Sequence, residues 1–157
     1  QSFTPITTIP DGDYSKVSFT FGFDNDDNYN ENYIDLNSAS WNVPELLGGG
    51  YHYMQLEGKF IDNTTTETGY AYHTIRAVDN SGATQVFQDT FFEVDVGAVN
   101  ITNNATFNIE MNIAEWFKNP NTWDLNVLNQ MLMPNSSAQI MMYENGQNVF
   151  NLESVNQ

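Results

Sequence analysis

The segment 16–24 alternates between apolar and polar residues. Its apolar positions are Val17, Phe19, Phe21 and Phe23. Because successive side chains of a strand point to opposite faces of a sheet, this period of two predicts a strand with one buried face. It is the clearest strand signal in the chain.

Four further segments are predicted to be strands, because they are rich in β-branched and aromatic residues and are bounded by polar turn residues. They are 51–61, 70–78, 84–96 and 105–113. The turn-like sequence DNTTTETG separates the first two, which are therefore expected to form a β-hairpin. Polar GAVNITNN joins the other two.

From residue 113 onward the spacing of apolar residues changes to that of short helices. IAEWFKNP at 113–120 has apolar residues three and four positions apart and ends at a proline, and TWDLNVLNQMLM at 122–133 repeats this pattern. The segment 136–155 begins like a helix, but its pair Asn145–Gly146 indicates a hairpin turn. The last residues are therefore expected to return to the sheet.

These elements predict a mainly β fold, a single-domain antiparallel β-sandwich of the immunoglobulin-like kind with short C-terminal helices. Residues 1–15 are polar and rich in Thr and Pro, so we expect an extended N-terminal leader followed by one domain at 16–157. A chain that opens on Gln1 without an apolar stretch resembles a mature N-terminus after removal of a signal peptide, although a trimmed chain would look the same. The expected location is secreted, periplasmic or at the cell surface.

Charge and the lack of cysteine narrow the functions that such a domain can have. The chain has 20 acidic and 4 basic residues and a net charge of −16, so we expect it to bind neither nucleic acid nor an anionic membrane surface. No run approaches the roughly 18 apolar residues of a membrane-spanning helix, so no membrane insertion is expected. Without cysteine, a disulfide, a thiolate ligand and a thiol nucleophile are all excluded.

The two histidines of the chain lie in the two strands of the predicted hairpin, His52 in YHYM and His73 in YAYH. A two-residue turn at Asp62 and Asn63 would place them directly opposite each other. A longer loop is the alternative, and any loop with an even number of residues leaves both rings on one face. Opposed or diagonal side chains have Cβ atoms roughly 5 to 8 Å apart, and two imidazole nitrogens on one metal lie roughly 4 Å apart. The two rings can therefore share one metal ion.

The neighbours of the histidines favour copper. Simple alternation places Met54 on the face of His52 and Glu57 on the other face. Imidazole suits copper and zinc, and thioether sulfur favours Cu(I), so His52, His73 and an auxiliary Met54 predict a copper site. Zinc would need a harder third ligand. The alternative is that both histidines only pack, with ring N–H groups bonded to backbone carbonyls, and that Met54 fills the core.

Two parts of the sequence resemble a known family. They are YHYMQLEG at 51–58 and a tail with WFKNP at 116–120, AQ at 138–139 and ENGQNVF at 144–150. From about residue 16 to residue 152 the chain resembles the MbnP-like proteins, which are relatives of a methanobactin-associated periplasmic copper protein and are common in Bacteroidetes. The resemblance implies an exported β-sandwich.

Copper-binding relatives in that family hold Cu(I) with two histidines and a tryptophan oxidised to kynurenine, which a di-haem peroxidase-like partner enzyme can generate. By position, the resemblance implies His52 and His73 as ligands. The tryptophan has no clear counterpart here, because the W-x-W pattern of those relatives is absent. Trp41 is the nearest in sequence, whereas Trp116 and Trp123 are expected to anchor the helices in the core. Whether any of the three is oxidised is left open.

A second candidate metal site is the acidic loop DNDDNYNENYID at 24–35. It places oxygen-bearing side chains at the spacing of a calcium-binding loop. They are Asp24, Asp26, Asn28, Asn30, Asn32 and Asp35. Tyr29 stands where such a loop needs glycine, the last position is Asp instead of Glu, and a strand precedes it. The alternative is a solvated acidic loop.

No residue pattern singles out catalytic chemistry, because acidic pairs occur throughout the chain and no serine lies in a nucleophile motif. We therefore expect no enzyme. The second functional hypothesis is a non-catalytic extracellular structural or adhesion module that calcium could stabilise. In such a module Tyr51, Tyr53, Tyr70 and Tyr72 would form an exposed aromatic strip, unless they only pack across strands. The sequence leaves self-assembly open.

Overall fold

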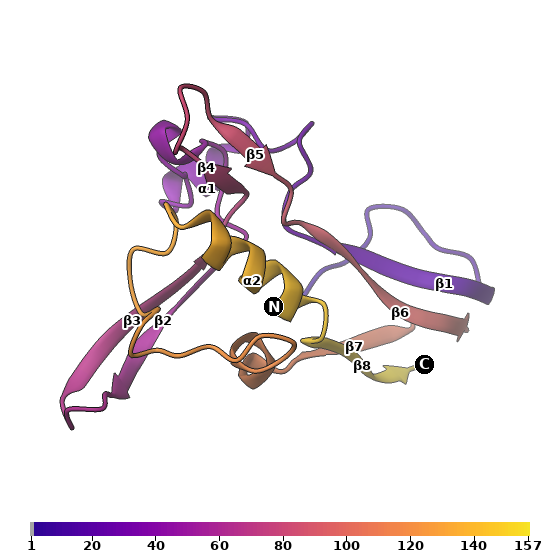
Figure 1. The fold of residues 1–157 in the computed structure, drawn as a ribbon. Coiled ribbons are helices and arrows are strands. Elements are labelled where there is room, and N and C mark those ends of the chain that lie inside the picture. Colours follow the sequence, from indigo (N-terminus) through magenta and orange to yellow (C-terminus); the bar gives the residue numbers. More distant parts are fainter. Residues whose placement is uncertain (1) are drawn as a thin grey trace.

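A computed structural model describes residues 2–157 and shows a mainly β protein (Figure 1). The strands are β1 (Gly12–Phe21), β2 (Met54–Ile61), β3 (Glu67–Thr74), β4 (Ala77–Asp79), β5 (Val86–Gln88), β6 (Phe92–Ile101), β7 (Thr106–Met111) and β8 (Phe150–Asn156). The helices are α1 (Ile34–Ser38) and α2 (Ser136–Gly146), with two 3₁₀ segments, η1 (Glu45–Leu47) and η2 (Ile113–Phe117).

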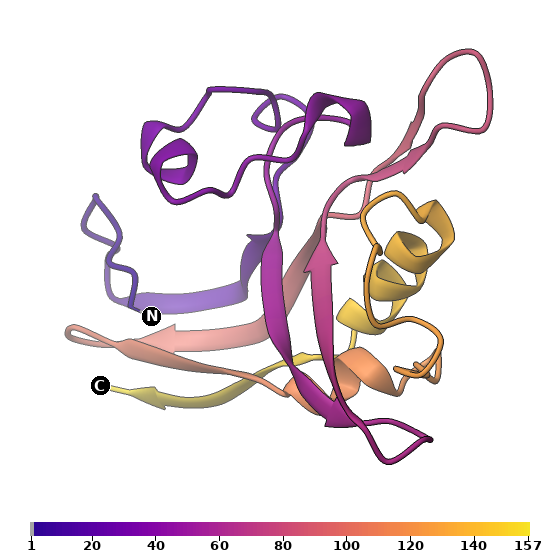
Figure 2. The same cartoon turned by 90° about the vertical axis from the view of Figure 1, so that its left-hand side faces the viewer.

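The strands form antiparallel pairs, β1 with β6, β2 with β3, β4 with β5 and β7 with β8. Figure 2 shows the β2–β3 hairpin crossing in front of the strands β1, β6, β7 and β8. Helix α2 packs against β3, β4 and η2. The mainly β prediction is thus confirmed, whereas the immunoglobulin-like strand order stays a prediction. No helix formed by residues 2–157 is both long enough and apolar enough to cross a membrane.

The alternating segment at the N-terminal side forms β1, as predicted. Phe19 and Phe21 pack against the core, and the ring of Phe21 lies 5.2 Å from that of Phe92 on β6. The strand ends before Gly22, whose positive φ of 99° suits glycine. It already begins at Gly12, inside the segment expected to be a leader, because residues 12–14 pair with β6.

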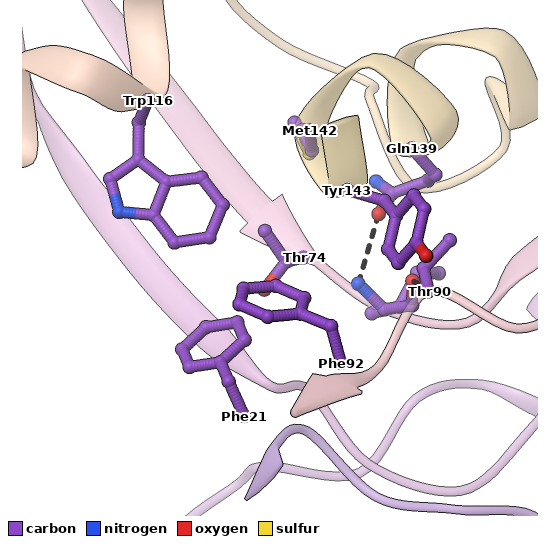
Figure 3. A pocket seen from close by; sticks show the side chains of 9 residues that line it. Phe21, Thr74, Thr90, Phe92, Trp116, Gln139, Met142 and Tyr143 are labelled. Atoms are coloured by element: carbon purple, nitrogen blue, oxygen red, sulfur yellow. Dashed lines mark hydrogen bonds between the residues drawn. The ribbon is translucent and has the colours of Figure 1, made fainter. Parts of the chain in front are cut away.

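The core lies between the β2–β3 hairpin, β6, η2 and α2. Trp116 is fully buried and Trp123 nearly so, which confirms both as core residues. The Phe21 ring also lies 5.4 Å from that of Trp116, and Figure 3 shows these two side chains near Phe92. The Tyr72 ring also packs against Trp123, with centroids 4.7 Å apart. The face of β3 that carries Tyr72 and Thr74 is therefore the buried face.

The apolar stripe at 122–133 does not form the predicted helix. The chain makes a single turn, in which the Leu128 N–H donates to the Asp124 carbonyl at 2.8 Å, and then runs irregularly. The Trp123 indole N–H donates to the Leu128 carbonyl, and the Ala71 N–H on β3 donates to the Asn129 carbonyl. The segment thus docks on the β2–β3 hairpin, and these tertiary bonds outweigh its helical spacing.

The hairpin predicted at Asn145–Gly146 is also wrong, because both residues are in the last turn of α2. The buried Asn145 amide donates to the carbonyls of Trp116 and Asn121, so it ties the helix to η2 and to the segment after it. A Cβ on Gly146 would lie 2.7 Å from the Phe92 ring, so glycine is required for packing. The chain does return to a sheet afterwards, as β8 beside β7.

Candidate metal centre

The β2–β3 hairpin has a longer loop than the two-residue turn that would place the histidines opposite each other. Pairing runs from Met54 with Thr74 to Ile61 with Glu67, and the five residues 62–66 form the loop. His73 therefore lies opposite Gln55. The longer-loop alternative is the correct one.

The Asp62 carboxylate stabilises this loop. Its Oδ1 accepts bonds from the hydroxyl and N–H of Thr64 and from the N–H of Thr66, and its Oδ2 accepts one from the Thr68 hydroxyl. These bonds, first that of the Thr64 hydroxyl and then that of the Thr66 N–H, lower the pKa of Asp62 to about 2. A capped five-residue loop thus sets the register.

His52 and His73 nevertheless come together. A loop with an odd number of residues would put them on opposite faces if β2 extended regularly to His52. The chain bends at Tyr53, however, and β2 begins only at Met54. The two imidazole centroids lie 5.2 Å apart with ring planes at 87°. The predicted convergence is therefore present, and the bend produces it.

Several polar groups hold the segment that carries His52. The Trp41 carbonyl accepts the backbone N–H of His52 at 2.9 Å and also contacts the Nδ1 of His52 at 2.9 Å. Side-chain oxygens of Asn28 and Asn30 accept the N–H groups of Tyr51 and Gly50, each at 2.8 Å. The preceding loop therefore orders the backbone around His52.

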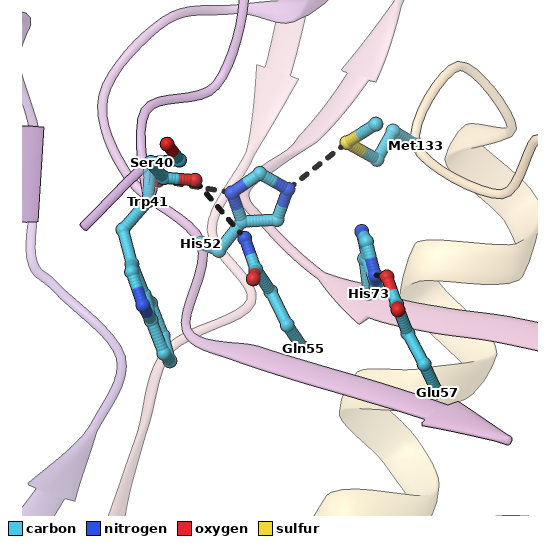
Figure 4. A network of polar contacts seen from close by, with 7 residues as sticks. All are labelled: Ser40, Trp41, His52, Gln55, Glu57, His73 and Met133. Carbon is cyan, nitrogen blue, oxygen red and sulfur yellow. Dashed lines mark hydrogen bonds and ion pairs between the residues drawn. The ribbon is translucent and has the colours of Figure 1, made fainter.

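The His52 ring presents its Nε2 toward a methionine (Figure 4). A carbonyl oxygen only accepts hydrogen bonds, so the contact with Trp41 requires the hydrogen on Nδ1. The Nε2 lies 3.2 Å from the Sδ of Met133. Burial, the largest effect, lowers the pKa of His52; the bond to Trp41 raises it and the nearby His73 lowers it. The ring is therefore neutral at pH 7, with a lone pair on Nε2.

The His73 ring is oriented by a carboxylate. Its Nε2 lies 2.8 Å from the Oε1 of Glu57, two residues along from Gln55 and on the same face of the hairpin. An ionised carboxylate only accepts, so Nε2 carries the hydrogen of this bond and Nδ1 is the ring nitrogen that can bind a metal. Metal-binding histidines commonly donate their second ring N–H to a carboxylate or a carbonyl. His52 has a carbonyl as this partner and His73 has a carboxylate.

A buried glutamine connects the two sides of the site. Gln139 on α2 is 1% exposed, and its Nε2 donates to the carbonyls of His73 and Leu132 at 2.9 and 3.1 Å. Its Oε1 accepts the N–H of Ile75 at 2.9 Å, the bond drawn in Figure 3. Leu132 directly precedes Met133. Gln139 thus fixes the end of β3 and the Met133 segment together, which sequence reasoning did not identify.

Met54, the auxiliary ligand expected from alternation, is on the other face of the hairpin from His73. It lies opposite Thr74 and is buried in the core cluster with Tyr72 and Trp116. This position corrects the expected arrangement, because the bend at Tyr53 separates the direction of His52 from that of Met54. The thioether beside His52 belongs to Met133, which is 81 residues away in sequence. No local pattern indicates that contact.

The tryptophans differ in their distance from the histidines. Trp41 touches His52 through its backbone carbonyl, and Figure 4 shows its indole extending away from Met133. Trp116 and Trp123 are buried in the core instead. Trp41 is therefore the tryptophan whose backbone belongs to the site.

The acidic loop uses much of its candidate ligand set in hydrogen bonds. Asn28 and Asn30 accept backbone N–H groups, as described above, and the Asp24 Oδ1 accepts those of Asp26 and Asp27 at 3.0 and 3.2 Å. Among residues 2–157, no group of three or more His, Asp or Glu side chains is arranged to hold a metal. Calcium binding by this loop stays a prediction.

The tyrosines expected to form an exposed strip are largely buried. Tyr51, Tyr53 and Tyr72 belong to the buried residues and Tyr70 is half-buried. The Tyr51 hydroxyl accepts the N–H of Tyr33 at 2.7 Å, so its polar end is bonded inside the protein. The expectation of an aromatic contact surface at these four positions is wrong, because three of the four side chains are buried in the protein interior.

Comparisons with known proteins give one match. The family model described as MbnP matches residues 1–142, most of the chain. Searches of curated proteins and of solved structures give no match.

Proposed function

Because this chain belongs to the MbnP family, we propose that it is an exported copper-binding protein whose His52 and His73 hold one Cu(I) ion for acquisition or delivery. The observation that carries this proposal is the approach of the two imidazoles, whose centroids are 5.2 Å apart. An immunoglobulin-like arrangement of the β-sandwich is part of the same proposal. Copper is the cargo of this protein, and no catalytic role is proposed.

The donor atoms suit the ion. Each imidazole has one ring nitrogen engaged, His52 through Trp41 and His73 through Glu57, so the other ring nitrogen is the one available to a metal. Neutral imidazole nitrogen is a good copper ligand. Both rings are mostly shielded from water, with 5% of His52 and 16% of the His73 side chain exposed. The net charge of −16 also attracts cations to the surface.

The location and the partner are proposed on the same family membership. We propose export to the periplasm, the cell surface or the medium, and a di-haem peroxidase-like enzyme as partner if a tryptophan is oxidised. Trp41 is then the tryptophan that we propose to be oxidised, because its carbonyl already contacts His52. The intact mass of protein isolated from its native source, followed by peptide mapping, identifies kynurenine and its position.

A structural module is the second candidate. It is supported by the fact that each ring already has a polar partner, a carbonyl for His52 and a carboxylate for His73. In that case the histidines would only stabilise the hairpin. The same bonds would orient two ligands, so binding has to be measured directly.

The test is an anaerobic Cu(I) titration against bicinchoninate. We expect one copper per chain for the wild type and none for His52→Ala or His73→Ala. Gln55→Ala is a matched control, because Gln55 is exposed and lies opposite His73. Circular dichroism of each apoprotein checks that the variants fold. Copper binding that survives both histidine substitutions, or a wild type that binds none, would support the structural module.

A further inference from the structure

We propose that Met133 is a third ligand, which completes a site of two imidazoles and one thioether and selects soft monovalent ions, Cu(I) and Ag(I), over Zn(II). This inference rests on the proposed function, because it concerns the same site. It adds a residue from a different part of the chain and a basis for the choice of metal.

The first argument comes from the atoms that face each other. The Nε2 of His52 and the Sδ of Met133 are 3.2 Å apart. With the Nδ1 hydrogen directed at Trp41, the neutral ring has only a lone pair on Nε2, and a thioether sulfur has no hydrogen to donate. Two electron-pair donors thus point at each other without a hydrogen between them. A cation bound by both would turn this contact into a favourable one.

The separation is close to what a shared ion needs. Nitrogen and sulfur ligands at bond lengths of roughly 2.0 and 2.3 Å lie roughly 3.5 Å apart when they bind one ion tetrahedrally. The contact of 3.2 Å between His52 and Met133 is a few tenths of an ångström shorter. A small rotation of the flexible methionine side chain provides the difference.

The surroundings hold Met133 in this place. Leu132 before it is 3% exposed, and the Leu132 carbonyl accepts a bond from Gln139. The same Gln139 amide binds the His73 carbonyl, so the thioether and the second imidazole are fixed to one side chain. Met133 itself is half-buried, whereas Met131 is 80% exposed. Of these two neighbouring methionines, only Met133 faces a histidine.

The thioether sulfur of Met133 also determines which metal ion the site prefers. Thioether ligands favour Cu(I), whereas Zn(II) prefers imidazole, thiolate or carboxylate. Met133 is therefore expected to add much to the affinity for Cu(I) and little to the affinity for Zn(II). Without a cysteine in the chain, a methionine is the available source of a soft ligand.

The test compares Met133→Leu with Met131→Leu, a matched control two residues away. Anaerobic bicinchoninate competition should show that Met133→Leu weakens Cu(I) binding at least about tenfold, since even outer partners of a metal contribute that much. Met131→Leu should leave Cu(I) affinity unchanged, and neither variant should change Zn(II) affinity. Copper K-edge absorption of the Cu(I)-loaded wild type should show one sulfur neighbour, which is lost in Met133→Leu alone.

The outcomes separate this inference from the function on which it rests. A wild type that binds copper through nitrogen without sulfur would overturn the role of Met133 and leave the histidine pair intact. Equal losses of Cu(I) and Zn(II) affinity in Met133→Leu would show a merely structural role and would also overturn it. A wild type that binds no copper would overturn the proposed function itself. The copper K-edge measurement on the wild type tests the role of Met133 even if the Met133→Leu variant does not fold.

Discussion

The ring of His52 lies 5.2 Å from that of His73 and nearly perpendicular to it, although the two residues are not cross-strand partners. Three separate parts of the chain maintain this relationship. The Trp41 carbonyl holds His52, the Glu57 carboxylate holds His73, and Gln139 binds the backbone carbonyl of His73. The pair is thus oriented before any ion arrives, which reduces the cost of ordering the ligands on binding.

Replacing the carboxylate that orients His73 should weaken copper binding. Glu57→Gln keeps the size of the side chain but removes the charge that favours a hydrogen on the Nε2 of His73. We expect Cu(I) affinity to fall about tenfold, the usual effect of losing such a partner. Bicinchoninate competition measures it. Glu67→Gln, which removes the exposed partner of Lys59 on the same hairpin, is the control, and equal effects of both changes would contradict this role.

Replacing the buried amide should affect both stability and binding. Gln139→Glu can still accept the Ile75 N–H but no longer donates to the carbonyls of His73 and Leu132. The free energy of unfolding should fall by more than the about 1–3 kcal/mol of an unsatisfied buried group, because the new carboxylate is buried without a cation and faces two carbonyl oxygens. Urea unfolding of the apoprotein measures it, and Cu(I) affinity should fall too. Gln130→Glu adds the same charge at an exposed position and should change neither.

Met54→Leu should leave copper binding unchanged, because Met54 is buried in the core on the face opposite His73. A volume-conserving change of this kind costs less than about 1.5 kcal/mol of unfolding free energy. Urea unfolding and Cu(I) competition on one preparation give both quantities. A loss of Cu(I) affinity as large as that of Met133→Leu would show that Met54 is the sulfur ligand after all.

The Asp62 cap should contribute stability in a defined range of pH. Hydrogen bonds lower the pKa of Asp62 to about 2 in the folded protein, against roughly 3.9 for an unfolded aspartate. A lowered carboxyl pKa gives stability that is present above pH 4 and is lost as the pH falls toward 2. Asp62→Asn should therefore lose less stability than the wild type across that range. Urea unfolding at several pH values tests this, and parallel curves for the two proteins would contradict it.

Local patterns predicted those features that depend on neighbouring residues. The period of two around Phe19 and Phe21 specifies β1, because each of these side chains must be buried on one face. The turn-like residues between 61 and 70 specify a hairpin. The two histidines were identified as a pair because they lie in its two strands.

Other features depend on contacts between distant residues, and the sequence alone did not reveal them. The register follows from the bonds of Asp62 to three threonines, and the position of His52 follows from a bend at Tyr53. Met133 is 81 residues from His52, and Gln139 is 66 residues from His73. Both reach the site because the segment before α2 docks on β3, against its own helical spacing.

The claim that both imidazoles bind one copper ion is tested most directly by ¹⁵N NMR of the histidine rings during an anaerobic Cu(I) titration. The chain has 2 histidines, so the spectrum contains only the nitrogens in question. We expect the Nε2 of His52 and the Nδ1 of His73 to shift together and to stop shifting at one equivalent, while Nδ1 of His52 and Nε2 of His73 keep their hydrogens. Shifts in only one ring, or in neither, would contradict the account.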